Sequence, residues 1–515
     1  MSVKYYFDFM HSNYIFELVT LFSNFVNFLI YFSIFLIIIL LYWFNLWENS
    51  LFNSNYFKVI IFFFIGSLSI YFYYVATLFY YNLPITWKAE NFFSLQSFFS
   101  SDIVFTINFF SSPEFTLQFI INKFNVSFLL LFFLLYWIVF VTIWHDYSAT
   151  NIKFYLYFFI IFNLVFLLVL VDNIILFYFL YETILVIVFA AMYLTSYSRA
   201  AIDALLYFLI WAIIGSILVA YGFFLLISIT NTLNFSELIW INFSSEEVYY
   251  IYLLFFFGFG VKLSIWPFWY WLPKAHVEVS TGMSIFLSCV LIKLSLYCLL
   301  KIQFYIYFYS HNNICILVCF FCVFDVMFRF LNLRDLKAVI AYSSVLHTNL
   351  LVALIHIDNI AILSNSMLYI WGHSLATAVL FWITAYLEYK YNTRSVIKLS
   401  GLWQNDSKLA KLLFFSLLSF IDVPVTMMFW GELWVWLNII STHPLLCFEL
   451  YFFAGILFVI FFFKIWWSVL LGTGSTIVSK LADNNFNVFC FLIGFFLFLN
   501  ILFGAHPVLL KYGLL

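Results

Sequence analysis

Long apolar segments separated by short polar ones dominate this chain of 515 residues. A helix needs about 20 apolar residues to cross the hydrocarbon core of a bilayer. Cutting the chain at its polar and charged positions gives fourteen segments of this kind, near residues 24–45, 57–82, 124–144, 152–171, 173–196, 202–229, 248–272, 280–303, 312–331, 337–356, 361–388, 409–440, 449–471 and 486–504. The pattern therefore predicts an all-α polytopic membrane protein with about 14 transmembrane helices, and an extramembrane loop over 83–123.

The composition agrees with a membrane protein. Hydrophobic residues make up 66% of the chain and charged residues only 9%, against about 25% charged residues in a soluble domain. The net charge of −2 and the lack of a Lys/Arg-rich run argue against a nucleic-acid partner. The N-terminus has no signal-peptide pattern, so the first apolar segment is expected to remain in the mature protein. Abundant Phe, Ile, Asn, Tyr and Lys indicate an A/T-rich, organellar gene.

Basic residues in the loops predict the orientation of the chain. Thirteen Lys and Arg residues fall in the odd-numbered loops and five on the other side, which predicts that both termini lie on the proton-rich side. Lys301 and Lys337 are counted among these loop residues. The remaining three basic residues, Lys262, Lys293 and Lys464, fall inside predicted spans.

Ionisable residues inside a membrane are costly and are functional candidates by default. Six of them lie on separate predicted spans: Glu182, Lys262, Lys293, His347, His373 and Glu432. Asp422 and Lys464 are further candidates, although a lysine near a span end can simply extend its ammonium to the membrane surface. A low dielectric disfavours the charged forms of carboxyl and amino groups, and histidine titrates near neutral pH. Joined by water, such groups form a proton relay.

Two predicted spans contain an interrupting proline. Pro267 lies in the seventh span with Lys262, and Pro424 lies in the twelfth with Glu432. Interrupted spans at corresponding positions point to a transporter site built from inverted repeats. The spacing therefore predicts two inverted five-helix repeats, with helices 7 and 12 broken so that water reaches the ionisable groups. A kink that only improves packing remains an alternative for Pro267 alone.

Redox cofactors have no sequence signature in this chain. It contains no GxGxxG stretch and no flavin motif, so it is expected to bind neither NADH, flavin nor an iron–sulfur cluster. Cys315, Cys319 and Cys322 share one helical face. In an apolar helix without a nearby His or Asp, this pattern favours small buried hydrophobic residues over metal ligands.

Several stretches resemble one family. "LPKAHVEVSTGMSIFLSCVLIK" resembles the "LPxAHxEAP…(L/I)LLK" signature of the antiporter-like subunits of respiratory complex I, and "LRDLKAVIAYSSVLHTNL" resembles their "DxKxxIAYSSxxHM" stretch. "FYFLYE" is similar to "FYxxFE", "IDVPVTMMFWGE" to "xGxPGTxxFxGE", and "NKFNVSFLL" faintly to "GxDGLS". The resemblance covers roughly residues 120–470. It implies an N-terminal part over 1–120, antiporter-like repeats over 121–310 and 311–475, and a C-terminal helix and tail over 476–515.

The resemblance also implies roles for the six ionisable residues that membrane cost alone had singled out. It makes Glu182 and Lys262 an ion pair on spans five and seven, Lys293 the central lysine, His347 and His373 linking histidines, and Glu432 the terminal group towards the exit channel. The chain departs from the family pattern at Val279 and Ser280, at Val425, and at Asn349, where a glycine is usual. The basic residue usual on the sixth span is also missing.

The resemblance implies a multi-pass subunit of the mitochondrial inner membrane that moves protons when quinone is reduced elsewhere in the complex. NADH, FMN, iron–sulfur clusters and ubiquinone would bind other subunits. Expected partners are two sibling antiporter-like chains, a lateral amphipathic helix from one of them, and membrane lipids. A subunit of a multi-chain bacterial Na⁺/H⁺ antiporter and an inert membrane scaffold remain alternatives.

Overall fold

The computed structural model describes residues 103–108, 116–121, 123–145, 152–196, 198–239, 241, 243–306, 313–330, 332–357, 361–421, 423–424, 426–442, 455, 460, 463–472, 493–498 and 500–501. The predicted spans near 24–45 and 57–82 lie outside the described residues, as does Asp422.

Helices make up nearly all of the described structure. The first group comprises α4 (Lys123–His145), α5 (Ile152–Leu170), α6 (Ile174–Thr195), α7 (Arg199–Thr230), α8 (Phe235–Leu238), α9 (Ser245–Leu263), the 3₁₀ turn η3 (Phe268–Tyr270) and α10 (Trp271–Glu278). The second comprises α11 (Thr281–Phe286), the π-helical turn η4 (Leu287–Leu291), α12 (Ile292–Tyr305), α13 (Asn313–Phe330), α14 (Leu336–Ile357), α15 (Ala361–Tyr391), α16 (Leu402–Asn405), α17 (Ser407–Phe420), α18 (Met427–Thr442) and the π-helical turn η5 (Trp466–Leu471).

The helices confirm the predicted class of fold at the level of a mostly helical membrane protein. Within the described ranges, six helical segments are long and apolar enough to cross a membrane: Ile174–Thr195, Arg199–Thr230, Glu246–Glu278, Thr281–Tyr305, Leu336–Ala353 and Ser366–Tyr391. Each falls on one of the predicted spans. The total of fourteen spans and the inverted repeats stay predictions.

Two short strands correct the all-α prediction. β1 (Ile103–Asn108) and β2 (Thr116–Ile121) pair in a two-stranded sheet within the stretch predicted as a loop. Both strands are rich in β-branched and aromatic residues, which favour extended backbone. They escaped prediction because each is only six residues long. β1 and most of β2 belong to one compact unit of the chain, whereas the helices belong to a second.

Polar residues between apolar segments set the helix starts. The side chain of Asn173 accepts a hydrogen bond from the backbone N–H of Leu176 at the start of α6, at 3.1 Å. Ser244 and Glu247 form a reciprocal capping box at the start of α9. Each cap satisfies backbone donors that a helix start leaves unpaired.

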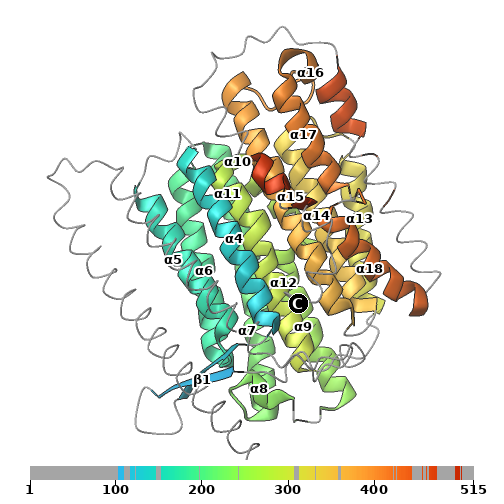
Figure 1. Ribbon diagram of the computed structural model, residues 1–515. Coiled ribbons are helices and arrows are strands. Elements are labelled where there is room, and N and C mark those ends of the chain that lie inside the picture. The colour runs from blue at the N-terminus through green and yellow to red at the C-terminus, as the bar shows by residue number, and fades with distance from the viewer. Residues whose placement is uncertain are drawn as a thin grey trace, which may run out of the picture. The chain divides into compact units, whose positions relative to one another are not determined.

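The helices of the second unit run alongside one another (Figure 1). α5, α6 and α7 form one side of this unit and α13 to α18 the other, with α4 and α9 to α12 between them. The close neighbours are α7 with α9, α9 with α12, α13 with α14, and α15 with α18. The broken segment α9–η3–α10 and the segment α11–η4–α12 therefore lie at the centre of the unit.

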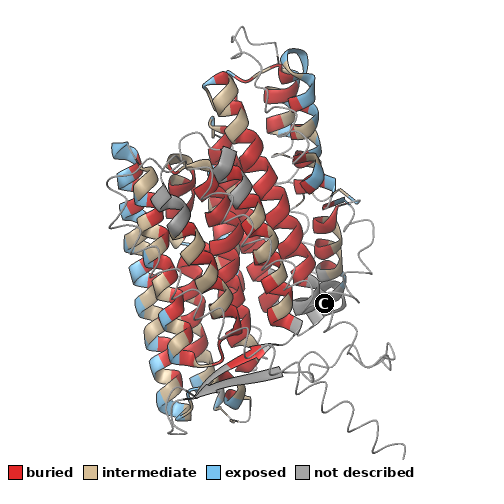
Figure 2. Ribbon diagram, turned by 60° about the vertical axis from the view of Figure 1, so that its left-hand side comes forward, coloured by how far each residue is buried: buried red, intermediate tan, exposed pale blue. Residues whose placement is uncertain are grey.

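Burial separates the central helices from the peripheral ones, as Figure 2 shows. All residues in the 18-residue apolar stretches of Thr281–Tyr305 and Ser366–Tyr391 are buried, whereas only 33% of the residues in the corresponding stretch of α7 are buried. The exposed side chains of α7 are themselves apolar, among them Ile217 and Phe224. An apolar exposed face is what a helix in contact with lipid or with another membrane subunit requires.

Glycines allow the closest helix contacts. A Cβ atom on Gly431 of α18 would lie 2.3 Å from the backbone nitrogen of Tyr369 in α15. A Cβ on Gly372 of α15 would lie 2.6 Å from the backbone nitrogen of Met428 in α18. Small residues at such crossings let two backbones touch, which is a common basis of helix association in membranes.

Candidate functional site

Glu182 of α6 and Lys262, next to the last residue of α9, form an ion pair. Lys262 Nζ lies 3.6 Å from Glu182 Oε1, and the two side chains are 3% and 25% exposed. The ammonium also lies 3.6 Å from the centre of the Tyr181 ring, in a cation–π contact. A buried ammonium with a carboxylate and an aromatic face as its neighbours forms an ion pair shielded from water on the lysine side.

The seventh span is broken directly after Lys262. α9 ends at Leu263, Ser264 takes a left-handed conformation with φ 60°, and regular helix resumes at Trp271, with Pro267 inside the gap. Asn349 Nδ2 of α14 donates to the carbonyl of Ser264 at 3.1 Å. Trp271 Nε1 donates to the carbonyl of Val261 at 2.7 Å. Protein donors therefore satisfy both of these freed carbonyls.

Lys293 lies just after a π-helical turn at the centre of the unit. Its Nζ donates to the carbonyl of Ser288 in this turn at 2.9 Å and lies 2.8 Å from Nδ1 of His373 on α15. The side chain is 2% exposed. An ammonium has only donors, so a protonated Lys293 requires His373 to accept at Nδ1 and carry its proton on Nε2. The π turn is one of the local distortions that membrane helices place at functional sites.

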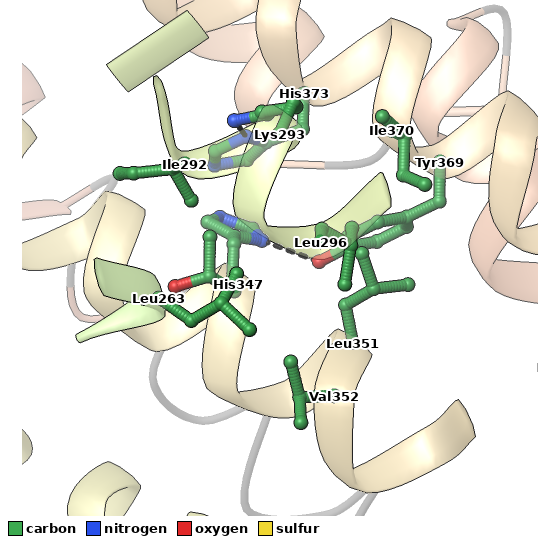
Figure 3. Close-up of a pocket in the computed structure, with 11 residues that line it drawn as sticks. Leu263, Ile292, Lys293, Leu296, His347, Leu351, Val352, Tyr369, Ile370 and His373 are labelled. Carbon is green, nitrogen blue, oxygen red and sulfur yellow. Dashed lines mark hydrogen bonds between the residues drawn. The ribbon is translucent and has the colours of Figure 1, made fainter. Parts of the chain in front are cut away.

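His347 of α14 lies beside this lysine–histidine contact. Its ring centre is 5.1 Å from that of His373, and its Nδ1 lies 2.7 Å from the hydroxyl of Tyr369. A cavity of about 10 Å³ adjoins these groups. It is lined by Lys293, His347, Tyr369 and His373 together with Thr348 and apolar side chains (Figure 3). The structure thus brings three of the predicted residues into one buried cluster.

Glu432 stands apart from that cluster. Its Oε1 accepts a hydrogen bond from Trp436 Nε1, one turn further along α18, at 2.9 Å, and its side chain is 8% exposed. The preceding residue, Gly431, packs against the backbone of Tyr369. The carboxyl group is therefore at the level of the histidine cluster along α15, but no described hydrogen bond or ion pair joins it to the other five predicted residues.

The twelfth span is also interrupted. α17 ends at Phe420 and α18 begins at Met427, with Pro424 in the intervening segment. Asn500 Oδ1 accepts from the backbone N–H of Met427 at 3.2 Å and so caps the start of α18. The break places a helix start close before Glu432.

Lys301 and Lys337 are not loop residues, which corrects the count used for orientation. Both lie in helices and both are 3% exposed. Lys301 Nζ donates to the carbonyl of Val171 after α5, and Lys337 Nζ donates to that of Val279 after α10, each at 2.6 Å. A cation at a helix C-terminus binds the last carbonyls and opposes the helix dipole. Both lysines fall within the bounds of predicted spans, and this position in the sequence could have indicated that they are buried.

Lys464 has the same kind of contact. Its Nζ donates at 2.6 Å to the carbonyl of Phe330, the last residue of α13. Its ammonium therefore bonds protein rather than only reaching for the membrane surface. This contact accounts for a lysine in an apolar segment without giving it a role in proton transfer.

Replacing Lys464 with methionine is expected to lower the thermal stability of the protein while leaving transport unchanged. A hydrogen bond to a charged group contributes about 1.5–3 kcal/mol, and half-burial reduces this. Thermal inactivation of the assembled protein measures the effect, with Lys464→Arg as the control that keeps a donor. A lowered transport stoichiometry in Lys464→Met would instead give this lysine a part in proton transfer.

A family described as "NADH:quinone oxidoreductase/Mrp antiporter, TM" matches residues 171–479. Among curated relatives, NADH-ubiquinone oxidoreductase chain 4 of Paramecium tetraurelia is 27% identical over 328 residues, covering 64% of this chain and 69% of the relative. The chain 4 protein of Acanthamoeba castellanii is 28% identical over 337 residues, covering 64% and 67%. That of Arabidopsis thaliana is 28% identical, and this chain spans 53% of its length.

Solved structures share the fold. A chain of the Mrp complex from Dietzia sp. DQ12-45-1b superposes with a TM-score of 0.71 at 15% identity, covering 80% of this chain and 85% of that one. A chain of respiratory complex I from Thermus thermophilus with bound NADH gives 0.70 at 18% identity, covering 80% and 87%. The family match covers more than half of the sequence, including all six predicted ionisable residues. The chain therefore belongs to the NADH:quinone oxidoreductase/Mrp antiporter transmembrane family.

Proposed function

We propose that this protein is the chain 4 subunit of NADH:ubiquinone oxidoreductase and moves protons through its buried Glu, Lys and His side chains. The chain is a multi-pass protein of the mitochondrial inner membrane. Its curated relatives are chain 4 proteins of eukaryotes, and they favour this assignment over a stand-alone antiporter. Electron transfer from NADH to ubiquinone would take place on other subunits and drive the proton movement here.

The contact that carries this proposal is the Lys293–His373 pair. The amino group lies 2.8 Å from the imidazole nitrogen, and both side chains are buried. Two groups at this distance can exchange a proton directly. His347 and the cavity beside it extend this pair by a second imidazole. In membrane proteins, proton pathways are marked by buried lysines and histidines that contact one another and face the protein interior rather than lipid.

The Glu182–Lys262 pair would act as the switch that couples this cluster to the rest of the complex. A carboxylate stabilises the charged form of the neighbouring ammonium, so a change in their separation changes how strongly Lys262 holds its proton. Asn349 of α14 bonds the carbonyl of Ser264, two residues after Lys262, and so links the broken span at this switch to the helix of His347. Movement at the pair is therefore transmitted to the cluster through the broken span.

Partners follow from the same proposal. Two sibling antiporter-like chains and a lateral amphipathic helix would cover parts of the apolar outer faces, and membrane lipids would cover the rest. No redox cofactor is assigned to this chain. Glu432 would release the proton at the far end of the path, across the second broken span.

A double-mutant cycle on Glu182 and Lys262 tests the proposal. Removing one partner of a buried ion pair leaves an uncompensated charge and costs about 3–5 kcal/mol, whereas removing both relieves it. We therefore expect Glu182→Gln with Lys262→Met to pump no worse than the more severe single variant. The measurement is NADH-driven acidification in vesicles containing the assembled complex.

The same cycle on a pair with no proposed transport role provides the control. Arg394 and Asp335 form a half-exposed ion pair at 2.6 Å, outside the buried cluster. Variants of these two residues are expected to leave the pumping stoichiometry intact. Losses for Glu182 and Lys262 that multiply independently would show that the two residues are not coupled.

A further inference from the structure

A buried tyrosine–histidine contact outside the cluster of Lys293 joins α9 to α14. The hydroxyl of Tyr252 on α9 forms a hydrogen bond with Nε2 of His356 on α14. The two side chains are 0% and 6% exposed. The ring of Phe256, one turn further along α9, packs edge-on against the imidazole, with the ring centres 5.2 Å apart. Neither Tyr252 nor His356 is among the candidates that the sequence indicated.

The second nitrogen of His356 defines the direction of this hydrogen bond. Its Nδ1 lies 2.6 Å from the carbonyl oxygen of Val352 on the same helix. A carbonyl oxygen only accepts, so Nδ1 carries the imidazole proton, and Nε2 of the neutral ring accepts from the Tyr252 hydroxyl. Both imidazole nitrogens therefore have a partner, and one partner belongs to the helix that carries Lys262.

Two polar contacts thus tie α9 to α14, one on each side of Lys262 along the chain. Tyr252 lies ten residues before this lysine, which is about 15 Å along a helix. Ser264, whose carbonyl accepts from Asn349 of α14, lies two residues after it. Apolar side chains alone give little preference for a protein neighbour over lipid, so hydrogen bonds between helices help to decide which neighbour a span follows. The half of the broken span that carries Lys262 is therefore anchored on α14.

We propose that the Tyr252–His356 hydrogen bond is a positioning contact that keeps this half-span on α14 when Glu182 moves with α6, an inference that rests on the proposed function. The proposed switch requires a change in the separation of Glu182 and Lys262. Their opposite charges attract, so a half-span without an anchor would follow Glu182, and the separation would stay the same. An anchor on α14 resists this pull. It also keeps Lys262 at a fixed place relative to His347, which lies on the same helix as His356.

Tyr252→Phe in the assembled complex tests this inference, because the change removes the hydroxyl and keeps the ring. Hydrogen bonds between membrane helices shift an equilibrium by roughly threefold to fifteenfold. We therefore expect NADH-driven acidification of vesicles, per electron transferred, to fall by a factor in this range. Electron transfer to an artificial acceptor should be unchanged.

Tyr297→Phe is the matched control. The Tyr297 hydroxyl is equally buried and also joins helices, but its partners are Asn125 of α4 and the carbonyl of Val169 in α5. We expect this variant to keep the wild-type ratio of protons to electrons. An equal loss in Tyr297→Phe would show that any missing buried hydroxyl lowers pumping, and the inference would be wrong.

Two substitutions of His356 separate a positioning contact from a side chain that only fills space. Glutamine keeps an acceptor for the Tyr252 hydroxyl, whereas leucine has none. We expect His356→Gln to keep the wild-type ratio and His356→Leu to lose as much as Tyr252→Phe. Combining Tyr252→Phe with His356→Leu should cause no further loss, because both remove the same bond. Equal losses in His356→Gln and His356→Leu, or wild-type pumping in Tyr252→Phe, would overturn the inference.

Lys293→Met distinguishes failure of this inference from failure of the proposed function. If Lys293→Met pumps poorly while Tyr252→Phe pumps normally, the relay stands and the Tyr252–His356 contact has no positioning role. If Lys293→Met also pumps normally, the relay itself is wrong.

Discussion

Replacing Lys293 with methionine is expected to lower NADH-driven proton pumping by about a hundredfold or more, which is the usual contribution of a positioned proton-transfer group. Lys293 is 2% exposed and joins the Ser288 carbonyl to His373. Methionine keeps an apolar stem of similar length, so the central helices should still pack and the complex should still assemble. Vesicle acidification, normalised to the amount of complex on native gels, measures the effect.

Lys301→Arg provides the control for this result. Lys301 is as deeply buried on the same helix but caps the end of α5, and arginine keeps the charge and the donor. We expect this variant to pump normally. If an assembled Lys293→Met complex kept the full ratio of protons to electrons, the relay would be wrong and the chain would act as a membrane scaffold.

Replacing Gly431 with alanine is expected to disrupt assembly of the complex. The added Cβ would lie 2.3 Å from the backbone nitrogen of Tyr369 and 2.7 Å from its Cα. Backbone cannot move aside as a flexible side chain does, so α18 must shift away from α15. Overpacking of this kind typically costs about 1–3 kcal/mol and occasionally more. The yield of assembled complex and its thermal inactivation temperature measure the loss.

Gly494→Ala is the matched control. A Cβ on Gly494 would meet nothing within 4 Å, and alanine favours helix over glycine by up to about 1 kcal/mol. This variant should therefore be as stable as the wild type or slightly more so. An assembled Gly431→Ala complex with wild-type stability would show that α15 and α18 are not held in backbone contact.

The sequence was informative wherever a residue conflicted with its surroundings. Glu182, Lys262 and Lys293 stand out because lipid penalises charge, whatever the tertiary structure, and Pro267 stands out because proline interrupts a helix in any context. The structure places Glu182 beside Lys262, and Lys293 beside His373. These residues could be identified from the sequence because the energetic cost of a charge or a proline in a membrane helix depends only on the surrounding segment.

Residues that suit a membrane helix gave no such signal. Tyr369 is one of 36 tyrosines, and only its contact with His347 distinguishes it. Asn349 was noted as a departure from the family pattern, but its bond to the Ser264 carbonyl depends on how α14 crosses the broken span. The glycine contacts of α15 and α18 likewise depend on the pairing of two helices far apart in the chain. Such roles arise from tertiary structure and cannot be derived from local pattern.

Charge inside an apolar segment also proved to have two meanings. Lys262 and Lys293 belong to the proposed site, whereas Lys301, Lys337 and Lys464 each bond a carbonyl at the end of a helix. The sequence alone cannot separate the two groups, because the distinction depends on which helix end lies beside each ammonium. The cost of placing a charge in a membrane therefore identifies candidate residues, and the contacts in the structure separate the site lysines from the lysines that cap helices.

The burial of α14 and α15 has a consequence for how the protein is made. The 18-residue apolar stretches of α14 and α15 have a mean hydropathy of only 1.3, and 94% and 100% of their residues are buried. The corresponding stretches of α6 and α7 have a mean hydropathy of 2.4, and less than half of their residues are buried. Strongly apolar helices enter the bilayer on their own, but polar side chains such as those of His347 and His373 raise the cost of insertion. During synthesis, α6 and α7 precede α14 and α15, and their higher hydropathy lowers the cost of inserting them into lipid. The helices with the histidines must then find protein neighbours as they leave the ribosome, so the histidines that we propose for transport would also make biogenesis of the second half depend on the first.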